Sequence, residues 1–315
     1  MARSKLGTVF HRAKQAYRAR DYQTAETLAR NVIESAEGSS TAHILLGTIY
    51  GSTGKYQEAI AEFNRAIELH PENPEAFNNL GVVYRQMNQP RDALYWITRA
   101  IALSPTKADI HYNLGNVHKM LNNYDEAIEA YKSAIKIDNA LAAAYNNLGT
   151  LYEQRGEFEN ATGVFTQGLQ EDANSPNLHY NLGIALQSEG KFEDAREQYQ
   201  RALKSRPGWK DGLNNLGIVL EKLERYDESV KTFQEILRID SDNATAHNNI
   251  ATVLAKQGRS DEAIAYFKRA LSNKPDYVRA AVNLGQILET YRNQNESLEE
   301  VRRLVSSAPD SVDLR

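Results

Sequence analysis

Apolar and polar residues follow a pattern along this chain that recurs every 34 residues. In residues 74–107, apolar or small side chains stand three or four residues apart at Phe77, Leu80, Gly81 and Tyr84, with polar residues between them. This spacing is typical of an α-helix that packs along one side and faces solvent along the other. A second stretch with similar spacing follows after a short break. Each period therefore predicts two amphipathic helices.

A small residue marks the period most clearly. Ala251 and Ala13 occupy the same site in two of the periods. Glycine occupies it in the other seven, at Gly47, Gly81, Gly115, Gly149, Gly183, Gly217 and Gly285. A fixed period of this length is the signature of repeat arrays, in which each unit packs on its neighbours. The chain is therefore predicted to be an array of like units.

Two further sites repeat in step with the glycine. Twelve residues after it, the residue is small in every period: Ala25, Ala59, Ala93, Ala127, Ala161, Ala195, Ser229, Ala263 and Ser297. Four residues later it is bulky in all periods but the first, where it is Ala29. Small sites surrounded by bulky ones indicate two helices that touch at the small sites and interlock at the large ones. Each unit is predicted to be a helical hairpin.

Prolines and glycines divide the units in the same way. Five prolines occupy unit position 32, beyond the second helix, where a residue that cannot extend a helix is expected: Pro71, Pro105, Pro207, Pro275 and Pro309. Pro74 and Pro176 stand at position 1, which suits the first helical turn, and Pro90 stands near the start of a second helix. Four glycines share position 15, the predicted turn between the helices: Gly54, Gly156, Gly190 and Gly258.

The period predicts the domain organisation without a single insertion or deletion. Residues 1–5 are a leader, residues 6–311 hold nine units, and residues 312–315 are a tail. The nine units are 6–39, 40–73, 74–107, 108–141, 142–175, 176–209, 210–243, 244–277 and 278–311.

The residues also carry a family resemblance. The stretch from Ala76 to Pro105, with its Asn-Asn-Leu-Gly-Val-Val-Tyr start and Asp-Ala-Leu centre, resembles a tetratricopeptide repeat, as do the equivalent stretches of every later unit. The resemblance implies an all-α fold, a right-handed superhelical α-solenoid of nine tandem 34-residue helix-turn-helix repeats. Because such arrays serve as interaction modules in unrelated processes, it implies little about the biological role.

Composition limits the classes of partner. The formal net charge of −4 and the isoelectric point near 6.0 argue against a chain-wide surface for nucleic acid or anionic membranes. No apolar run is long enough for membrane insertion. The sequence has no cysteine, which excludes disulfides and thiolate metal sites.

The start of the chain is the one region of biased charge. Six basic residues precede the first acidic residue, Asp21, and they are Arg3, Lys5, Arg12, Lys14, Arg18 and Arg20. The periodic sites favour the interpretation that this stretch is the first helix of unit one. An organelle-targeting peptide and a basic end cap that meets an acidic partner remain alternatives.

Helical geometry predicts a ligand-binding face. In the first helix of each unit, positions 4, 7, 8 and 11 cluster on the packed side, and positions 2, 5, 6, 9 and 13 point away from it. Position 6 is asparagine in seven consecutive units: Asn79, Asn113, Asn147, Asn181, Asn215, Asn249 and Asn283. Asparagine forms helices poorly, so the row requires a compensating role. The amides could hold adjacent units in register, or they could bind the polar groups of an extended peptide backbone; we favour the second role, and the two are compatible.

The asparagine row strengthens the resemblance. It resembles the asparagine ladder in the repeat region of O-linked N-acetylglucosamine transferases and kinesin light chains, and this resemblance implies that the row holds extended peptide. Position 5 adds further candidate binding residues, namely Asn78, Asn146, Asn214, Asn248, Tyr112 and Tyr180. The tyrosines are expected to supply selectivity. Position 5 is never the lysine that chaperone-binding relatives use to clamp a carboxylate, so binding of an acidic chaperone tail is not the leading hypothesis.

The sequence offers little support for catalysis. Four histidines share position 4, a packing site, and are interpreted as packing residues: His43, His111, His179 and His247. His111 and His118 share a helix face but stand two turns apart, too far for one metal ion. No phosphate loop or nucleophile motif occurs, and repeats occupy nearly all of the chain. We expect no catalytic residues, no metal and no cofactor.

Three functional hypotheses follow. The first is a non-enzymatic scaffold that binds extended segments of partner proteins in a concave, asparagine-lined groove. The second is a structural element that forms homo-oligomers through its ends or convex face, and the third is a substrate-targeting region that works with a glycosyltransferase-type enzyme. A cytoplasmic location is expected; export, directed by a signal sequence not contained in these residues, is the alternative.

Overall fold

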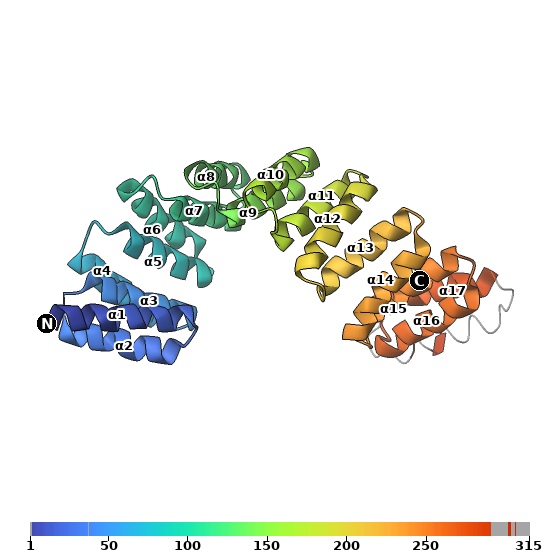
Figure 1. The fold of residues 1–315 in the computed structure, drawn as a ribbon, viewed down its shortest axis with the longest axis horizontal. Coiled ribbons are helices and arrows are strands. Elements are labelled where there is room, and N and C mark those ends of the chain that lie inside the picture. Colours follow the sequence, from blue (N-terminus) through green and yellow to red (C-terminus); the bar gives the residue numbers. More distant parts are fainter. Residues whose placement is uncertain (1, 37, 291–301, 304–305, 307–315) are drawn as a thin grey trace. The chain divides into compact units, whose positions relative to one another are not determined.

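The computed structural model describes residues 2–36, 38–290, 302, 303 and 306, and all regular secondary structure in them is α-helical (Figure 1). The helices are α1 (Ala2–Arg18), α2 (Tyr22–Ser35), α3 (Ser40–Ser52), α4 (Tyr56–Leu69), α5 (Pro74–Gln86), α6 (Pro90–Leu103), α7 (Ala108–Met120), α8 (Tyr124–Ile137), α9 (Ala142–Gln154), α10 (Phe158–Glu171), α11 (Pro176–Ser188), α12 (Phe192–Ser205), α13 (Lys210–Lys222), α14 (Tyr226–Ile239), α15 (Ala244–Lys256), α16 (Ser260–Asn273) and α17 (Val278–Thr290). Their packing divides the chain into two units, Met1–Leu151 and Tyr152–Arg315.

Within each unit the helices pack as hairpins on successive neighbours. In the first unit, α5 contacts α6 in its own hairpin, α4 and α3 before it, and α7 after it. In the second unit, α13 contacts α14, α12, α11 and α15 in the same arrangement. The prediction of an all-α solenoid of paired helices is confirmed. Of the predicted second helix of residues 278–311, the structure describes only Arg302, Arg303 and Ser306, which are helical.

The small and bulky sites meet as predicted. A Cβ atom built on Gly217 would lie 2.5 Å from the Cζ atom of Phe233, far inside van der Waals contact. The same construction at Gly183 meets the Tyr199 ring at 2.6 Å. Ser229 replaces the usual alanine, and its hydroxyl donates a hydrogen bond to the Gly217 carbonyl at 2.7 Å. The two helices of a hairpin therefore approach most closely where the period places its smallest residues.

A left-handed residue joins the two helices of each hairpin. The φ angles of Gly54, Gly156, Gly190 and Gly258 lie between 74° and 78°, as expected for the predicted turns. The four other hairpins between α1 and α16 place a non-glycine residue at the same site with φ between 58° and 61°: Arg20, Asn88, Asn122 and Glu224. Residues with a Cβ atom adopt this conformation at a cost of about 1–2 kcal/mol. These turns therefore hold local strain.

Replacing Glu224 by glycine is expected to stabilise the protein by about 0.5–1 kcal/mol. The exposed Glu224 has φ of 58°, and relief of its steric strain exceeds the entropy that glycine adds to the unfolded chain. Chemical unfolding of the two proteins measures the difference. The matched control is Glu235→Gly, an exposed site inside α14, which should destabilise by about 1 kcal/mol. If both substitutions lower the free energy of unfolding equally, Glu224 is not strained in the folded protein.

Prolines begin helices as the sequence predicted. Pro74, Pro90 and Pro176 are the first residues of α5, α6 and α11. At that position the missing N–H would have had no partner inside the helix, and the fixed φ suits the helical turn. Pro90 is thus compatible with its second helix.

Candidate functional site

The seven position-6 asparagines lie in the first helices of their hairpins, and all seven are half-buried. Asn79, Asn113 and Asn147 belong to the first unit on α5, α7 and α9. The second unit holds the others on α11, α13, α15 and α17, namely Asn181, Asn215, Asn249 and Asn283. Each group forms the ladder of its own unit.

Hydrogen bonds connect the amides of the second unit into one continuous chain. The Asn283 side-chain N–H donates to Asn248 Oδ1 at 3.4 Å, and Asn248 in turn donates to Asn249 Oδ1 at 3.1 Å. Asn249 donates to Asn214 Oδ1 at 2.9 Å, and Asn214 donates to Asn215 Oδ1 at 3.5 Å.

The chain ends on Tyr180, whose hydroxyl oxygen accepts from the Asn215 side chain at 3.2 Å. Every donor in it belongs to the acceptor's own repeat or to the repeat that follows. Four carboxamides both accept and donate along this path, so their planes are held in one orientation: Asn214, Asn215, Asn248 and Asn249.

The first unit has the same contacts between repeats. Asn113 donates to Asn78 Oδ1 at 3.0 Å, and Asn147 donates to the Tyr112 hydroxyl at 3.2 Å. Asn147 also donates to Asn116 Oδ1 at 2.8 Å, an acceptor that the sequence did not single out.

The Asn79 side chain lies at the other end of this row, and it donates to Thr48 Oγ1 at 3.4 Å. The described ladder amides therefore bond along the stack, which is the arrangement that a role in holding adjacent repeats in register requires.

Two of the four position-5 asparagines lie deeper than expected for direct contact with a ligand. Asn78 and Asn248 expose only 4% and 1% of their surface, and Asn146 and Asn214 are half-buried. Asn78, Asn214 and Asn248 each accept from the ladder amide of the next repeat. In these contacts a position-5 side chain accepts the hydrogen bond that fixes a ladder amide.

Both predicted tyrosines are held against other aromatic rings. Tyr112 lies 6.0 Å from Tyr131 between ring centres, and Tyr180 lies 5.9 Å from Tyr199 and 4.3 Å from Trp209. Burial raises the pKa of Tyr180, so its hydroxyl stays protonated at neutral pH. The sequence did not place Trp209 beside this face, because Trp209 lies in the loop before α13 and helical periodicity does not predict its direction.

The position-4 histidines pack as expected and also form hydrogen bonds. The Nε2 atoms of His111, His179 and His247 lie 2.8–3.0 Å from the carbonyl oxygen six residues earlier, in the loop before each helix. Burial lowers the pKa of His118. Across residues 2–36 and 38–290, no cluster of three potential metal-ligating side chains occurs.

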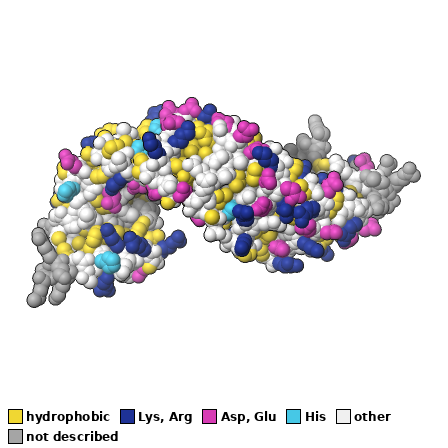
Figure 2. All heavy atoms as spheres, turned by 45° about the horizontal axis from the view of Figure 1, so that its top comes forward, with side chains coloured by type: hydrophobic (Ala, Val, Ile, Leu, Met, Phe, Trp, Pro, Cys, Tyr) yellow, Lys and Arg dark blue, Asp and Glu magenta, His cyan; other side chains and the backbone are white. Residues whose placement is uncertain are grey.

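Charges near the ladder are mixed, and one carboxyl group is unusual. On the face drawn in Figure 2, acidic and basic side chains are interspersed. Glu221 is paired with Lys256 at 2.5 Å. The half-buried Glu153 has no hydrogen-bond partner for its buried Oε1 atom in the described part of the chain, and burial raises its pKa to about 7.

The raised pKa of Glu153 predicts a pH-dependent stability. The folded state holds this proton more tightly than the unfolded state does, so the contribution is most favourable below pH 4.5 and is lost as the pH rises towards 7. Glu153→Gln should therefore raise the free energy of unfolding at pH 8 by about 1–2 kcal/mol, a value reduced for the partial exposure of the carboxyl group.

Urea unfolding of the wild type and Glu153→Gln at pH 4 and pH 8 measures this effect. Because charged groups elsewhere titrate equally in both proteins, the difference between them isolates Glu153. A difference that is the same at both pH values would contradict the assignment.

Comparisons with known proteins identify the family to which this chain belongs. Sequence profiles described as TPR repeat match residues 47–88 and 83–122, and profiles described as tetratricopeptide repeat match 108–139, 144–176, 176–208, 211–276 and 248–312. Together with the helical hairpins, these matches show that the chain belongs to the tetratricopeptide repeat family. No curated protein matches the chain closely enough to count as a relative.

Solved structures share the fold at low sequence identity. The C-terminal part of a TPR repeat-containing protein from Cytophaga hutchinsonii aligns with a TM-score of 0.65 at 17% identity, over 76% of this chain and 99% of that one. The APC/C hetero-tetramer Cut9–Hcn1 aligns with a TM-score of 0.57 at 20% identity, over 85% of this chain and 52% of the matched chain. This chain thus spans about half the length of that relative.

YrrB, a TPR protein with an unusual peptide-binding site, aligns with a TM-score of 0.50 at 22% identity, over 62% of this chain and 97% of that one. Identities this low establish a common fold and no common ligand. Among the described helices none is long and apolar enough to span a membrane.

Proposed function

We propose that this protein is a non-enzymatic scaffold that binds extended segments of partner proteins along the asparagine-lined face of its first helices. The observation that carries the proposal is the row of half-buried amides held in one orientation by bonds between repeats. An asparagine amide has two N–H donors, and the ladder bond uses one of them at Asn113, Asn215, Asn249 and Asn283. Among the described residues the second N–H of these four amides has no partner, so it can bond a ligand.

Preorganisation makes this arrangement suitable for binding. A side chain that is already fixed loses little entropy when a ligand bonds to it, so more of the hydrogen-bond energy appears as affinity. Helices pack about 8–10 Å apart and an extended chain rises about 3.3 Å per residue, so neighbouring amides would meet about every third residue of a bound peptide. Such contacts address the backbone and give little sequence preference.

Other proteins support the proposal indirectly. Tetratricopeptide repeats serve as interaction scaffolds, and the matched protein YrrB is described as having a peptide-binding site. The asparagine row resembles the ladder with which O-linked N-acetylglucosamine transferases and kinesin light chains hold peptide. We extend that function to the two ladders of this chain.

Backbone-modified peptides test the proposal. We expect unrelated peptides of about twelve residues to bind the monomer with similar affinities. Methylation of one backbone nitrogen that contacts the ladder should weaken binding about fivefold or more, because one hydrogen bond is worth about 1 kcal/mol. Peptides methylated at each position in turn should show losses about every third residue.

Two results would contradict the scaffold. One is a peptide affinity that backbone methylation leaves unchanged and that depends only on the peptide's side chains. The other is sedimentation showing that peptide-free homo-oligomers form through this face, with no peptide bound by the monomer; that result would favour the assembly role.

A further inference from the structure

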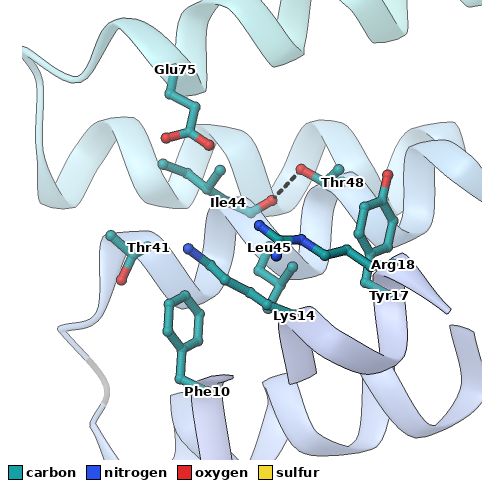
Figure 3. A pocket seen from close by; sticks show the side chains of 9 residues that line it. All are labelled: Phe10, Lys14, Tyr17, Arg18, Thr41, Ile44, Leu45, Thr48 and Glu75. Carbon is teal, nitrogen blue, oxygen red and sulfur yellow. Dashed lines mark hydrogen bonds between the residues drawn. The ribbon is translucent and has the colours of Figure 1, made fainter. Parts of the chain in front are cut away.

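The first two repeats depart from the ladder and form a cavity instead. Their position-6 residues are His11 and Leu45, and their position-5 residues are Phe10 and Ile44. A cavity of about 250 Å³ lies on this face between α1, α3 and α5, inside the first unit (Figure 3). Here the protein presents an apolar surface where later repeats present amides.

The floor of the cavity is apolar. Ile44 and Leu45 on α3 expose 4% and 7% of their surface, and the half-buried Phe10 lies beside them on α1 (Figure 3). None of these side chains can bond a peptide backbone. The floor can instead bury an apolar side chain, which stabilises a complex by about 25 cal/mol per Å² removed from water.

Two cations border this floor. Lys14 and Arg18 are exposed, stand one helical turn apart on α1, and extend towards the cavity (Figure 3). The Lys14 ammonium lies 4.8 Å from the centre of the Phe10 ring. In the part of the chain that the structure describes, neither cation lies within 4.0 Å of a carboxylate oxygen, and Glu75 across the cavity has no ion pair either. The cavity therefore has a net positive charge.

The cavity is continuous with the first ladder amide. A neighbouring cavity of about 200 Å³ shares Tyr17 and Thr48 with it and reaches Asn79. Thr48 accepts the hydrogen bond from Asn79 and donates to the Ile44 carbonyl at 2.8 Å. An extended segment lying on Asn79 can thus continue into the basic, apolar cavity.

We propose that this cavity is a specificity subsite for an apolar residue followed two positions later by an aspartate or glutamate in the bound segment. Alternate side chains of an extended chain point to the same side about 7 Å apart. The apolar side chain would lie on Ile44 and Leu45, and the carboxylate would pair with Lys14 and Arg18. The inference rests on the proposed scaffold function and adds a sequence preference that the ladder lacks.

Paired peptides test the subsite. A twelve-residue peptide with an amidated C-terminus and one apolar-x-acidic motif is compared with the same peptide carrying asparagine or glutamine in place of the acid. We expect the acidic peptide to bind about tenfold more tightly at low salt and the advantage to shrink at high salt. Lys14→Gln combined with Arg18→Gln should remove the advantage and leave the affinity of the neutral peptide unchanged.

Further variants separate the two proposals. Leu45→Asn should weaken binding of the motif peptide, because it replaces part of the apolar floor by a polar group. Asn113→Ala should weaken binding of both peptides equally. If both peptides bind and the acid gives no advantage, the subsite is refuted and the scaffold stands. Equal binding by a peptide that has a free C-terminal carboxylate and no acidic side chain would also refute the side-chain assignment. If no peptide binds, both proposals fail. Circular dichroism of each variant confirms that it folds.

Discussion

Replacing Asn215, Asn249 and Asn283 of the second unit together by alanine is expected to weaken binding of an extended peptide by about a hundredfold or more. Each amide contributes about 1 kcal/mol or more to the complex, and three of them together exceed two factors of ten. Isothermal titration with peptides of unrelated sequence measures the loss. Helical content should be unchanged or slightly higher, because alanine forms helices better than asparagine by up to about 0.7 kcal/mol per residue.

A matched variant controls for the loss of three asparagines. Asn64, Asn160 and Asn174 are exposed and lie outside the first-helix face, so their joint replacement by alanine should leave peptide affinity unchanged. The ladder variant should also unfold at lower denaturant, because Asn215 and Asn249 donate to Tyr180 and Asn214. Reduced stability with unchanged peptide affinity would show that the ladder amides only hold adjacent repeats in register.

Replacing Phe233 by alanine is expected to lower the free energy of unfolding by about 3–5 kcal/mol. The Phe233 side chain is fully buried on α14 and fills the space left by Gly217 on α13. Truncation leaves a cavity as well as losing transfer free energy, and a stack of helices cannot collapse freely around it. Chemical unfolding followed by circular dichroism measures the change.

A double-mutant cycle tests the close contact behind this prediction. Gly217→Ala alone places a methyl group within 2.5 Å of the Phe233 ring and should destabilise the hairpin by about 1–3 kcal/mol. Combined with Phe233→Leu, the same substitution should be less harmful, since the smaller side chain can yield space. Additive effects would indicate that the two helices do not touch at this pair. The array already holds a tolerated alanine at this site, Ala251 opposite Phe267.

The repeat period determined most of the fold, because each hairpin is stabilised by contacts within itself and with its neighbours. The 34-residue spacing placed small against large at Gly217 and Phe233, and it placed the left-handed turns at glycines such as Gly190. It also predicted which side of each first helix carries the amides. These features follow from local geometry that repeats identically along the chain.

The offset between adjacent repeats was decided only in the tertiary structure. Asn113 reaches back 35 residues to Asn78, but Asn79 reaches back 31 residues to Thr48. Helical periodicity gives the direction of a side chain about its own axis and says nothing of the rotation between one hairpin and the next. That rotation buries Asn78 and Asn248, and it opens the cavity beside Leu45. For this reason the sequence identified the ladder but neither the direction of its hydrogen bonds nor the subsite at its end.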